Sequence, residues 1–322
     1  MIKILYAGSP DAARITLENL YNKQKEFGFE IAGVLSNPPS AKGRHKELTP
    51  TPVAAFALEK NIPVITPEHL KAEARDMIKP LGAELLVSFA YGHIFGPKFL
   101  EMFKFGGINL HPSLLPKYRG CTPVPAAILN RDSETAVSIQ TLALKMDEGN
   151  ILAQKKIILT GKETTDSLLT ESAETGAALI CDVIKMIQNE GKVPEGLSQK
   201  GNSSYTSIIT KENAKIDWNK SAAVIEAEIR AYYSDPCSWA VETVGNNKQP
   251  LKILEATFET SAGSFENEPC GKVISFDKQK GIGVKTGSGI LWITVLQRQG
   301  KKAMNYKDFM NGARDFVGTI LE

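Results

Sequence analysis

Cysteine is scarce in this sequence, and its spacing forms no metal-binding or disulfide pattern. The 322 residues contain four cysteines, none of them in a C-x-x-C pair: Cys121, Cys181, Cys237 and Cys270. Zinc sites and disulfide frameworks usually depend on closely spaced or numerous cysteines. We therefore expect reduced thiols, no metal site and a cytoplasmic location.

Long apolar runs are missing as well. No stretch reaches the roughly 18 apolar residues that a transmembrane helix needs, so we do not expect a membrane as a partner. The opening residues MIKILYAGSP hold an apolar run that is too short for a signal peptide and that instead predicts a first strand.

Charge and motif patterns argue against a nucleotide-binding protein and against an enzyme that forms a covalent acyl intermediate. The formal net charge is +2, so charge alone neither requires nor excludes a nucleic-acid partner. Gly8 follows the first expected strand, but Pro10 and Asp11 interrupt a G-x-G-x-x-G pattern and no Walker A loop occurs, which argues against a nucleotide site. No Ser or Cys stands in a nucleophile-elbow context, so covalent acyl-enzyme chemistry is unsupported.

Strand-like and helical segments alternate in the first part of the chain. The expected strands are residues 3–7, 29–36, 62–65 and 84–90, and the expected helices are 11–26, 52–60 and 67–79. Residues 37–50 are polar and turn-rich and predict a loop. The alternation indicates a Rossmann-like α/β domain with a mostly parallel sheet. Such sheets bind ligands outside the carboxyl ends of their strands.

The pattern changes further along the chain. Expected strands at 135–143 and 151–159 flank a bend at 145–149, and a long amphipathic helix is expected at 165–190. Residues 191–207 are rich in Gly, Ser and Pro and predict a linker. A helix at 221–231 then precedes short strand-like runs that predict a small OB-like β-barrel: 238–244, 251–257, 271–276, 281–285 and 290–296. We expect a catalytic domain at 1–190, a linker at 191–207 and a β-barrel domain at 208–322.

The segment GINLHPSLLPKYRG, residues 107–120, carries the strongest chemical signal. Asn109 and His111 follow an apolar run, and alternation along a strand would place both side chains on one face at the strand end. Asp147 is the best candidate for a carboxylate that orients the imidazole, although a structural turn Asp would fit its position equally well. An amide and an imidazole beside a cleft suit direct acyl transfer through a stabilised oxyanion.

Basic residues gather in two places. Lys42, Arg44, His45 and Lys46 lie in the polar segment 37–50. The second group lies late in the barrel, where only Asp277 and Asp308 oppose it within the same stretch: Lys278, Lys280, Lys285, Arg298, Lys301, Lys302 and Lys307. A solvated surface is the more common meaning of such runs, and contact with an RNA backbone is the alternative.

The residues INLHPSLLPKYRG resemble the signature of the folate-dependent formyltransferases. Further segments resemble, in the same order and almost end to end, those bacterial members of the family that act on methionyl-tRNA: AGSPDAA, KGRHKELTPTPV, SFAYGHIFG, KENAKIDW, IRAYYSDPCSW and GKKAM. The resemblance covers both predicted domains.

The resemblance implies a set of site residues. Asn109, His111 and Asp147 would be catalytic. The donor 10-formyltetrahydrofolate would bind around Ser113, Leu114, Leu115 and Pro116, with Phe89, Tyr91 and Gly92 at the pterin pocket. The loop with Lys42, Arg44 and Lys46 would meet the acceptor stem of tRNA, and the barrel with Arg298, Lys301 and Lys302 would hold the tRNA body.

The implied activity is transfer of the formyl group to the amino group of methionyl-initiator tRNA for translation initiation. The expected partners are that tRNA and folate, without DNA, and the expected state is a monomer. Three positions depart from the family pattern: His45 and Glu47 stand in place of Gly and Lys, and Asn150 stands in place of Asp.

Other acceptors remain open at this point. An amino-sugar nucleotide is the main alternative, because such enzymes share the formyl donor and can carry a similar second domain. A glycinamide ribonucleotide enzyme would leave residues 208–322 without a role. A non-catalytic RNA-binding module would need none of the three catalytic residues, and a folate hydrolase would differ only in admitting water.

Overall fold

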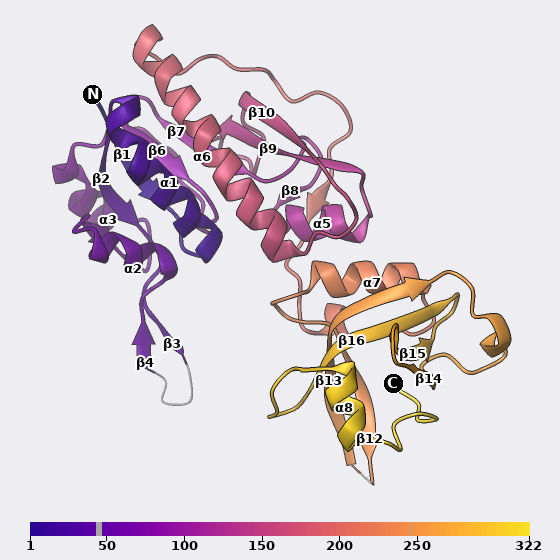
Figure 1. The fold of residues 1–322 in the computed structure, drawn as a ribbon. Coiled ribbons are helices and arrows are strands. Elements are labelled where there is room, and N and C mark those ends of the chain that lie inside the picture. The colour runs from indigo at the N-terminus through magenta and orange to yellow at the C-terminus, as the bar shows by residue number, and fades with distance from the viewer. Residues whose placement is uncertain (43–46, 246) are drawn as a thin grey trace. The chain divides into compact units, whose positions relative to one another are not determined.

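The computed structural model describes residues 1–42, 47–245 and 247–322, with the Lys42 side chain also left undescribed (Figure 1). These residues form two compact units. The first comprises Met1–Pro123, Glu134–Ile158 and Leu168–Ser207, and the second comprises Val124–Ser133, Leu159–Ser167 and Ile208–Glu322.

A seven-stranded sheet, counted over the described residues, forms the centre of the first unit in the order β10-β9-β7-β6-β1-β2-β5. Strands β5, β2, β1, β6 and β7 run parallel, whereas β9 is antiparallel to both β7 and β10. The predicted mostly parallel α/β sheet is thus confirmed. The bounds are β1 (Ile2–Ala7), β2 (Phe29–Leu35), β5 (Val64–Ile65), β6 (Leu85–Ser88), β7 (Gly107–His111), β9 (Glu134–Thr141) and β10 (Ile151–Ile158).

Helices connect and cover these strands: α1 (Asp11–Phe27), α2 (Pro52–Glu59), α3 (Ala72–Ile78), α4 (Pro97–Leu100) and most of α6 (Thr165–Glu190). Helix α5 (Pro123–Leu129) belongs, apart from Pro123, to the second unit. Helix α6 packs closely on the sheet at Gly176. A Cβ at this position would lie 2.0 Å from Leu110 Cδ1 on β7 and 3.3 Å from Val137 Cγ1 on β9. The small residue therefore lets α6 approach the strand that carries Asn109 and His111.

Two segments differ from the sequence expectation. Within the segment predicted as a loop, β3 (Ser40–Lys42) and β4 (Glu47–Thr49) pair as an antiparallel hairpin. Residues 191–207, predicted as a linker, belong to the first unit, where β11 (Tyr205–Thr206) pairs in parallel with β8 (Arg119–Gly120). Both pairings involve strands of only two or three residues, which are too short to show the alternation over roughly four to eight residues that identifies a strand in sequence.

An antiparallel sheet forms the second unit, with its strands paired in the order β12-β13-β16-β15-β14 and β17 added to β16. Ile225 and Ile229 of α7 pack with Leu251 and Ile253 of β13 in one apolar core. This curled half-barrel matches the small β domain expected from the sequence, and α8 is an addition to it. The bounds are α7 (Ala222–Ala231), β12 (Trp239–Val244), β13 (Asn247–Glu259), β14 (Val273–Asp277), β15 (Gly281–Lys285), β16 (Ile290–Arg298), β17 (Met304–Asn305) and α8 (Tyr306–Gly312).

Short 3₁₀ turns at Lys79–Leu81, Glu212–Ala214 and Gly263–Phe265 complete the secondary structure. None of the helices in the described residues is both long enough and apolar enough to cross a bilayer.

Candidate active site

Asn109 and His111 lie at the carboxyl end of β7, as the sequence predicts. On one side Asn109 pairs with Ser88 of the parallel strand β6, and on the other it pairs with Gln140 of the antiparallel strand β9. Directly paired residues share a face of the sheet, so Asn109 and Gln140 lie side by side. No described residue makes a hydrogen bond to the half-buried Asn109 amide, which leaves its N–H groups available to a ligand.

Asp147 lies in the turn between β9 and β10 and has a left-handed backbone, with φ of 55°. Its Oδ1 is 3.5 Å from His111 Nδ1. Gln140 Nε2 donates to Oδ1 at 2.8 Å, and the Gly120 backbone N–H donates to Oδ2 at 2.8 Å. The turn is tight because a Cβ on Gly149 would lie 1.7 Å from the Thr141 carbonyl oxygen. The fold thus brings the predicted carboxylate to the predicted imidazole.

The environment of His111 favours a neutral ring. Burial lowers its pKa below the ordinary value of 6.5, and Arg119 lowers it further, while Asp147 and the Tyr118 carbonyl act in the opposite direction. Nε2 lies 2.8 Å from the Tyr118 carbonyl oxygen, which can only accept, so Nε2 must carry the proton. Nδ1 is then unprotonated and faces Asp147. The tautomer is therefore set by a backbone carbonyl, and Asp147 is placed to stabilise the ring after Nδ1 gains a proton.

The segment after β7 holds its own shape. Ser113 is fully buried, and its hydroxyl donates to the Lys117 carbonyl oxygen at 2.7 Å. The Ser113 carbonyl in turn accepts from Ser138 Oγ at 2.7 Å. Leu115 is buried, whereas Leu114 and Pro116 are half-buried. Of the residues predicted at the folate, Ser113 therefore supports the turn, and Leu114 and Pro116 offer apolar surface.

Aromatic side chains line the end of β6. Phe89 and Tyr91 are buried and Gly92 is exposed. Tyr91 stacks on Phe95 with 5.6 Å between ring centroids and an interplanar angle of 14°. The Tyr91 hydroxyl has no hydrogen-bond partner in the described part of the chain, and burial raises its pKa to about 12. The Tyr91 hydroxyl is therefore a protonated donor enclosed within the protein, at the end of β6.

A second set of polar residues, which the sequence did not indicate, surrounds the Asp147 turn: Arg119, Gln140, Glu148, Gln199 and Tyr205. Arg119 belongs to the signature segment, but Gln199 and Tyr205 come from the stretch predicted as a linker. Only the fold reveals that this stretch returns to the site.

Two family models match the chain, "Formyl transferase" at residues 2–184 and "Formyl transferase, C-terminal domain" at residues 208–314. The chain belongs to the formyl transferase family. Its sequence is 40% identical over 326 residues to a methionyl-tRNA formyltransferase of Treponema denticola, covering 98% of each chain. As a member of this family, the protein is a formyltransferase enzyme.

Solved structures of the family share the fold. A methionyl-tRNA formyltransferase from Clostridium thermocellum is 16% identical with a TM-score of 0.56, covering 80% of this chain and 94% of that one. The sugar 3N-formyl transferase WlaRD, solved with dTDP and 5-N-formyl-THF, is 22% identical with a TM-score of 0.60, covering 94% of this chain and 99% of that one.

The residues predicted to contact tRNA differ in how the fold places them. Arg44 and Lys46 lie outside the described residues, as does the side chain of Lys42, whose backbone belongs to β3. Lys301 and Lys302 are exposed. Arg298 is engaged within the protein: its Nε lies 2.9 Å from Glu242 Oε1 and its Nη2 lies 2.9 Å from Oε2.

Sheet pairing also brings acidic groups to the basic stretch of the formyltransferase from elsewhere in the chain. Besides the Glu242 partner of Arg298, Glu259 pairs with Lys280 at 2.6 Å. Lys285 is buried, and its Nζ donates to the Thr286 carbonyl oxygen. Asp277 and Asp308 are the acidic residues within the basic stretch itself, as expected. In the fold, Glu242 and Glu259 from outside this stretch also pair with its cations.

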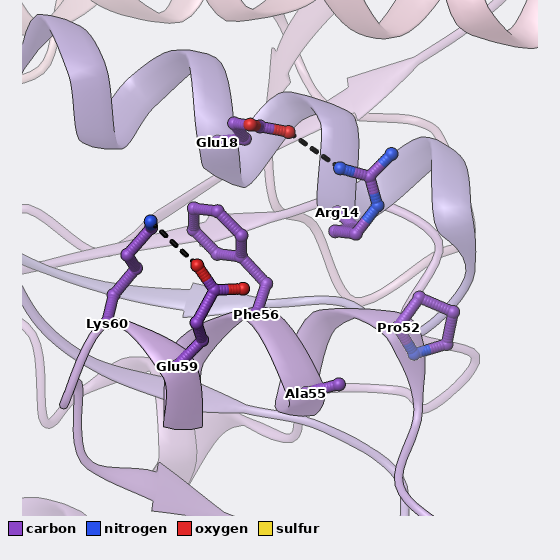
Figure 2. A pocket seen from close by; sticks show the side chains of 7 residues that line it. All are labelled: Arg14, Glu18, Pro52, Ala55, Phe56, Glu59 and Lys60. Atoms are coloured by element: carbon purple, nitrogen blue, oxygen red, sulfur yellow. Dashed lines mark hydrogen bonds and ion pairs between the residues drawn. The ribbon is translucent and has the colours of Figure 1, made fainter.

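A surface hollow lies between α1 and α2 of the formyltransferase, and none of the residues that line it is a predicted site residue (Figure 2). It has a volume of about 320 Å³ and is lined by Arg14, Glu18, Pro52, Ala55, Phe56, Glu59 and Lys60. Its two cations are already paired, Arg14 with Glu18 at 2.6 Å and Lys60 with Glu59 at 2.9 Å. No described group of His, Cys, Asp and Glu residues is placed to hold a metal ion.

Proposed function

We propose that this formyltransferase moves the formyl group of 10-formyltetrahydrofolate to the amino group of methionine carried by initiator tRNA. The observation that supports the chemistry is the arrangement of Asn109, His111 and Asp147 at the end of β7. The acceptor is supported by the similarity to methionyl-tRNA formyltransferases, which extends through both domains.

Asn109 and His111 would serve different parts of the transfer. The Asn109 amide has N–H groups free to donate to the formyl oxygen as negative charge develops there, an interaction whose removal typically costs about 10²–10³ in rate. His111 Nδ1 is the nitrogen that can receive a proton from the attacking amine and pass it to N10 of the folate as the bond between N10 and the formyl carbon breaks. Asp147, 3.5 Å from that nitrogen, would stabilise the resulting imidazolium.

The donor would be held by the two segments that flank the trio. Leu114 and Pro116 offer half-buried apolar surface, and Tyr91 lies buried at the end of β6 on the other side. Together with Phe89, Gly92, Ser113 and Leu115 they form the predicted folate site, with Ser113 acting through the shape of the turn. These groups bind and orient the donor, and the folate supplies the activated formyl group.

The remaining assignments follow from the same proposal. Residues 1–190 would carry catalysis together with 191–207, which belong to the first unit, and 208–322 would bind the tRNA body with Lys301 and Lys302. The loop containing Lys42, Arg44 and Lys46 would meet the acceptor stem. The protein would act as a cytoplasmic monomer, without a metal, DNA or membrane partner.

The acceptor is tested by offering 10-formyltetrahydrofolate with methionyl-initiator tRNA and, separately, with a dTDP-linked amino sugar. The proposal predicts formylation of the tRNA at least about a hundredfold faster in kcat/KM. Formylation of the sugar alone would reject the acceptor while keeping the chemistry. Release of formate without either acceptor product would instead indicate a hydrolase.

A further inference from the structure

Gln199 lies at the centre of a hydrogen-bond network that ends on the Asp147 carboxylate. Its Nε2 lies 2.8 Å from the carbonyl oxygens of both Asp147 and Gly149, and 3.2 Å from Gln140 Oε1. Its Oε1 accepts from Arg119 Nη2 at 2.8 Å and from Nε at 3.1 Å. Both ends of this one amide are therefore committed.

The chemistry of the partners determines which way each amide points. Arg119 can only donate, and backbone carbonyls can only accept, so Gln199 must present its oxygen to Arg119 and its NH₂ to the turn. Gln140 then receives a donor at its Oε1 and presents its own NH₂ to Asp147 Oδ1 at 2.8 Å. Gln199 therefore satisfies the oxygen of the Gln140 amide while Asp147 satisfies its NH₂.

Arg119 anchors the network from the other side. It is 9% exposed, and its Nη1 contacts Glu148 Oε1 at 3.0 Å and Tyr205 Oη at 2.9 Å. Tyr205 also donates to Glu148 at 2.7 Å, and this bond lowers the pKa of that carboxyl. The pairing of β8 with β11 holds Arg119 and Tyr205 on adjacent backbone positions. Gln199 is therefore held by a charged, mostly buried partner.

We propose that Gln199 and Gln140 are positioning residues that hold the Asp147 carboxylate toward His111 for formyl transfer. This inference rests on the proposed function of the trio and adds residues that reach the reaction only through Asp147. The left-handed backbone of Asp147 is uncommon for a residue with a side chain, although Asp adopts it more readily than most, so contacts to the turn help to fix its geometry. The two carbonyls bound by Gln199 flank the turn, and Gln140 binds its carboxylate.

The molecule offers a matched control for Gln199. Gln188 on α6, in the same unit, also uses its Nε2 to donate to two backbone carbonyls, those of Phe27 at 3.0 Å and Gly28 at 2.8 Å. Replacing either residue with Met removes an amide that holds a backbone turn while keeping the side-chain length and adding no charge. The Gln188 amide holds the chain between α1 and β2 rather than the Asp147 turn, so an effect specific to Gln199 is not a general effect of losing an amide.

The experiment compares steady-state formylation by wild type, Gln199→Met, Gln188→Met and Gln140→Met. We expect Gln199→Met and Gln140→Met to lower kcat by about ten- to a hundredfold, comparable with the loss of a residue that orients a metal ligand in a metalloenzyme. KM for folate and for tRNA should stay within about threefold, and Gln188→Met should keep the wild-type kcat. In the double variant Gln199→Met/Gln140→Met the two losses should be less than additive, because both act through one carboxylate.

A second readout follows the ring itself. Asp147 and Arg119 are the charged groups facing His111, and Asp147 raises its pKa. Displacement of the carboxylate in Gln199→Met should therefore lower the His111 pKa measured by NMR titration, whereas Gln188→Met should leave it unchanged. If the Gln199 amide had only a structural role, its loss would lower the melting temperature without changing the His111 pKa.

Failure of this inference differs from failure of the proposed function. If wild type does not formylate methionyl-tRNA, the proposed function fails. If wild type is active and Gln199→Met matches Gln188→Met in kcat and in His111 pKa, the positioning role is wrong. If Gln199→Met does not fold, Gln140→Met decides, and an unchanged kcat in that variant overturns the proposal.

Discussion

Gln140 Nε2 donates to Asp147 Oδ1 at 2.8 Å, and the same oxygen lies 3.5 Å from His111 Nδ1. Gln140 sits on β9 directly opposite Asn109 of β7. One pair of antiparallel strands therefore presents the free Asn109 amide and supports the carboxylate behind His111. This arrangement leads to predictions that separate the chemistry, the tRNA contacts and the stability of the fold.

The acid limb that His111 contributes to the pH dependence of kcat should lie below pH 6.5. Burial lowers the His111 pKa from its ordinary value of 6.5, so the ring stays neutral, and able to take a proton, as the pH falls through that value. Asp147 raises this pKa, so Asp147→Asn should lower kcat and move the limb to still lower pH. Measuring kcat from pH 5 to pH 8 at saturating methionyl-tRNA checks both statements, because the free amino group of the substrate, with an ordinary pKa of about 8, adds its own limb to kcat/KM. A limb that moves to higher pH in Asp147→Asn would contradict them.

The same shift affects stability. The unfolded chain binds a proton at His111 near pH 6.5, whereas the folded state binds it only at lower pH, so the free energy of unfolding should fall as the pH drops below about 6.5. His111→Gln should make the free energy of unfolding depend less on pH in this range. Urea unfolding at pH 7 and at pH 5 would measure the free energy of unfolding of both proteins. The same loss of free energy between the two pH values in wild type and in His111→Gln would contradict the prediction.

Lys301 and Lys302 should contribute to tRNA binding without affecting the chemistry. Both are exposed, and the double substitution Lys301→Ala/Lys302→Ala should raise KM for tRNA several-fold at constant kcat. The dependence of log affinity on log salt should become shallower by up to about two units of slope, one for each phosphate that a lysine no longer neutralises. The exposed residue Lys98 on α4, substituted in the same way, serves as a control for the removal of positive charge.

Arg298 should matter more for stability than for tRNA binding. Its partner Glu242 is 2% exposed and would be left as a buried, unpaired charge in Arg298→Ala. We expect a loss of up to about 3 kcal/mol, less than for a fully buried pair because the Arg298 side chain is partly exposed. Thermal unfolding would detect it, and an unchanged melting temperature with weakened tRNA binding would instead make Arg298 a direct tRNA contact.

Gly176→Ala should destabilise the first unit. The new Cβ would overlap Leu110 Cδ1 and push α6 away from β7, and overpacking of this kind costs about 1–3 kcal/mol. Gly312→Ala, at the end of α8, is the matched control, since a Cβ there meets no atom within 4 Å. If Gly176→Ala leaves the melting temperature at the wild-type value, the close packing of α6 on β7 is wrong.

The sequence predicted those features that depend on local pattern. Alternation along an apolar strand placed Asn109 and His111 on one face at the end of β7, and the Gly-containing bend between two strands located Asp147. The helix at 165–190 was also predicted with its observed bounds, because its apolar residues recur with helical spacing over many turns.

Features that depend on distant pairing could not be predicted in this way. Gln199 lies in a polar stretch with the composition of a linker, and nothing local shows that it returns to Arg119 and Asp147. Arg298 looked like a free cation because Glu242 is far away in the sequence and meets it only through the antiparallel sheet. Such contacts are determined by topology rather than by composition.

The central claim is that His111, supported by Asp147, takes part in formyl transfer. The most direct test is the single-turnover rate of methionyl-tRNA formylation from 10-formyltetrahydrofolate, measured for wild type and for folded Asn109→Ala, His111→Ala and Asp147→Ala. We predict that each substitution lowers this rate by at least about a hundredfold, with folate still bound. Near wild-type rates in folded His111→Ala would contradict the account.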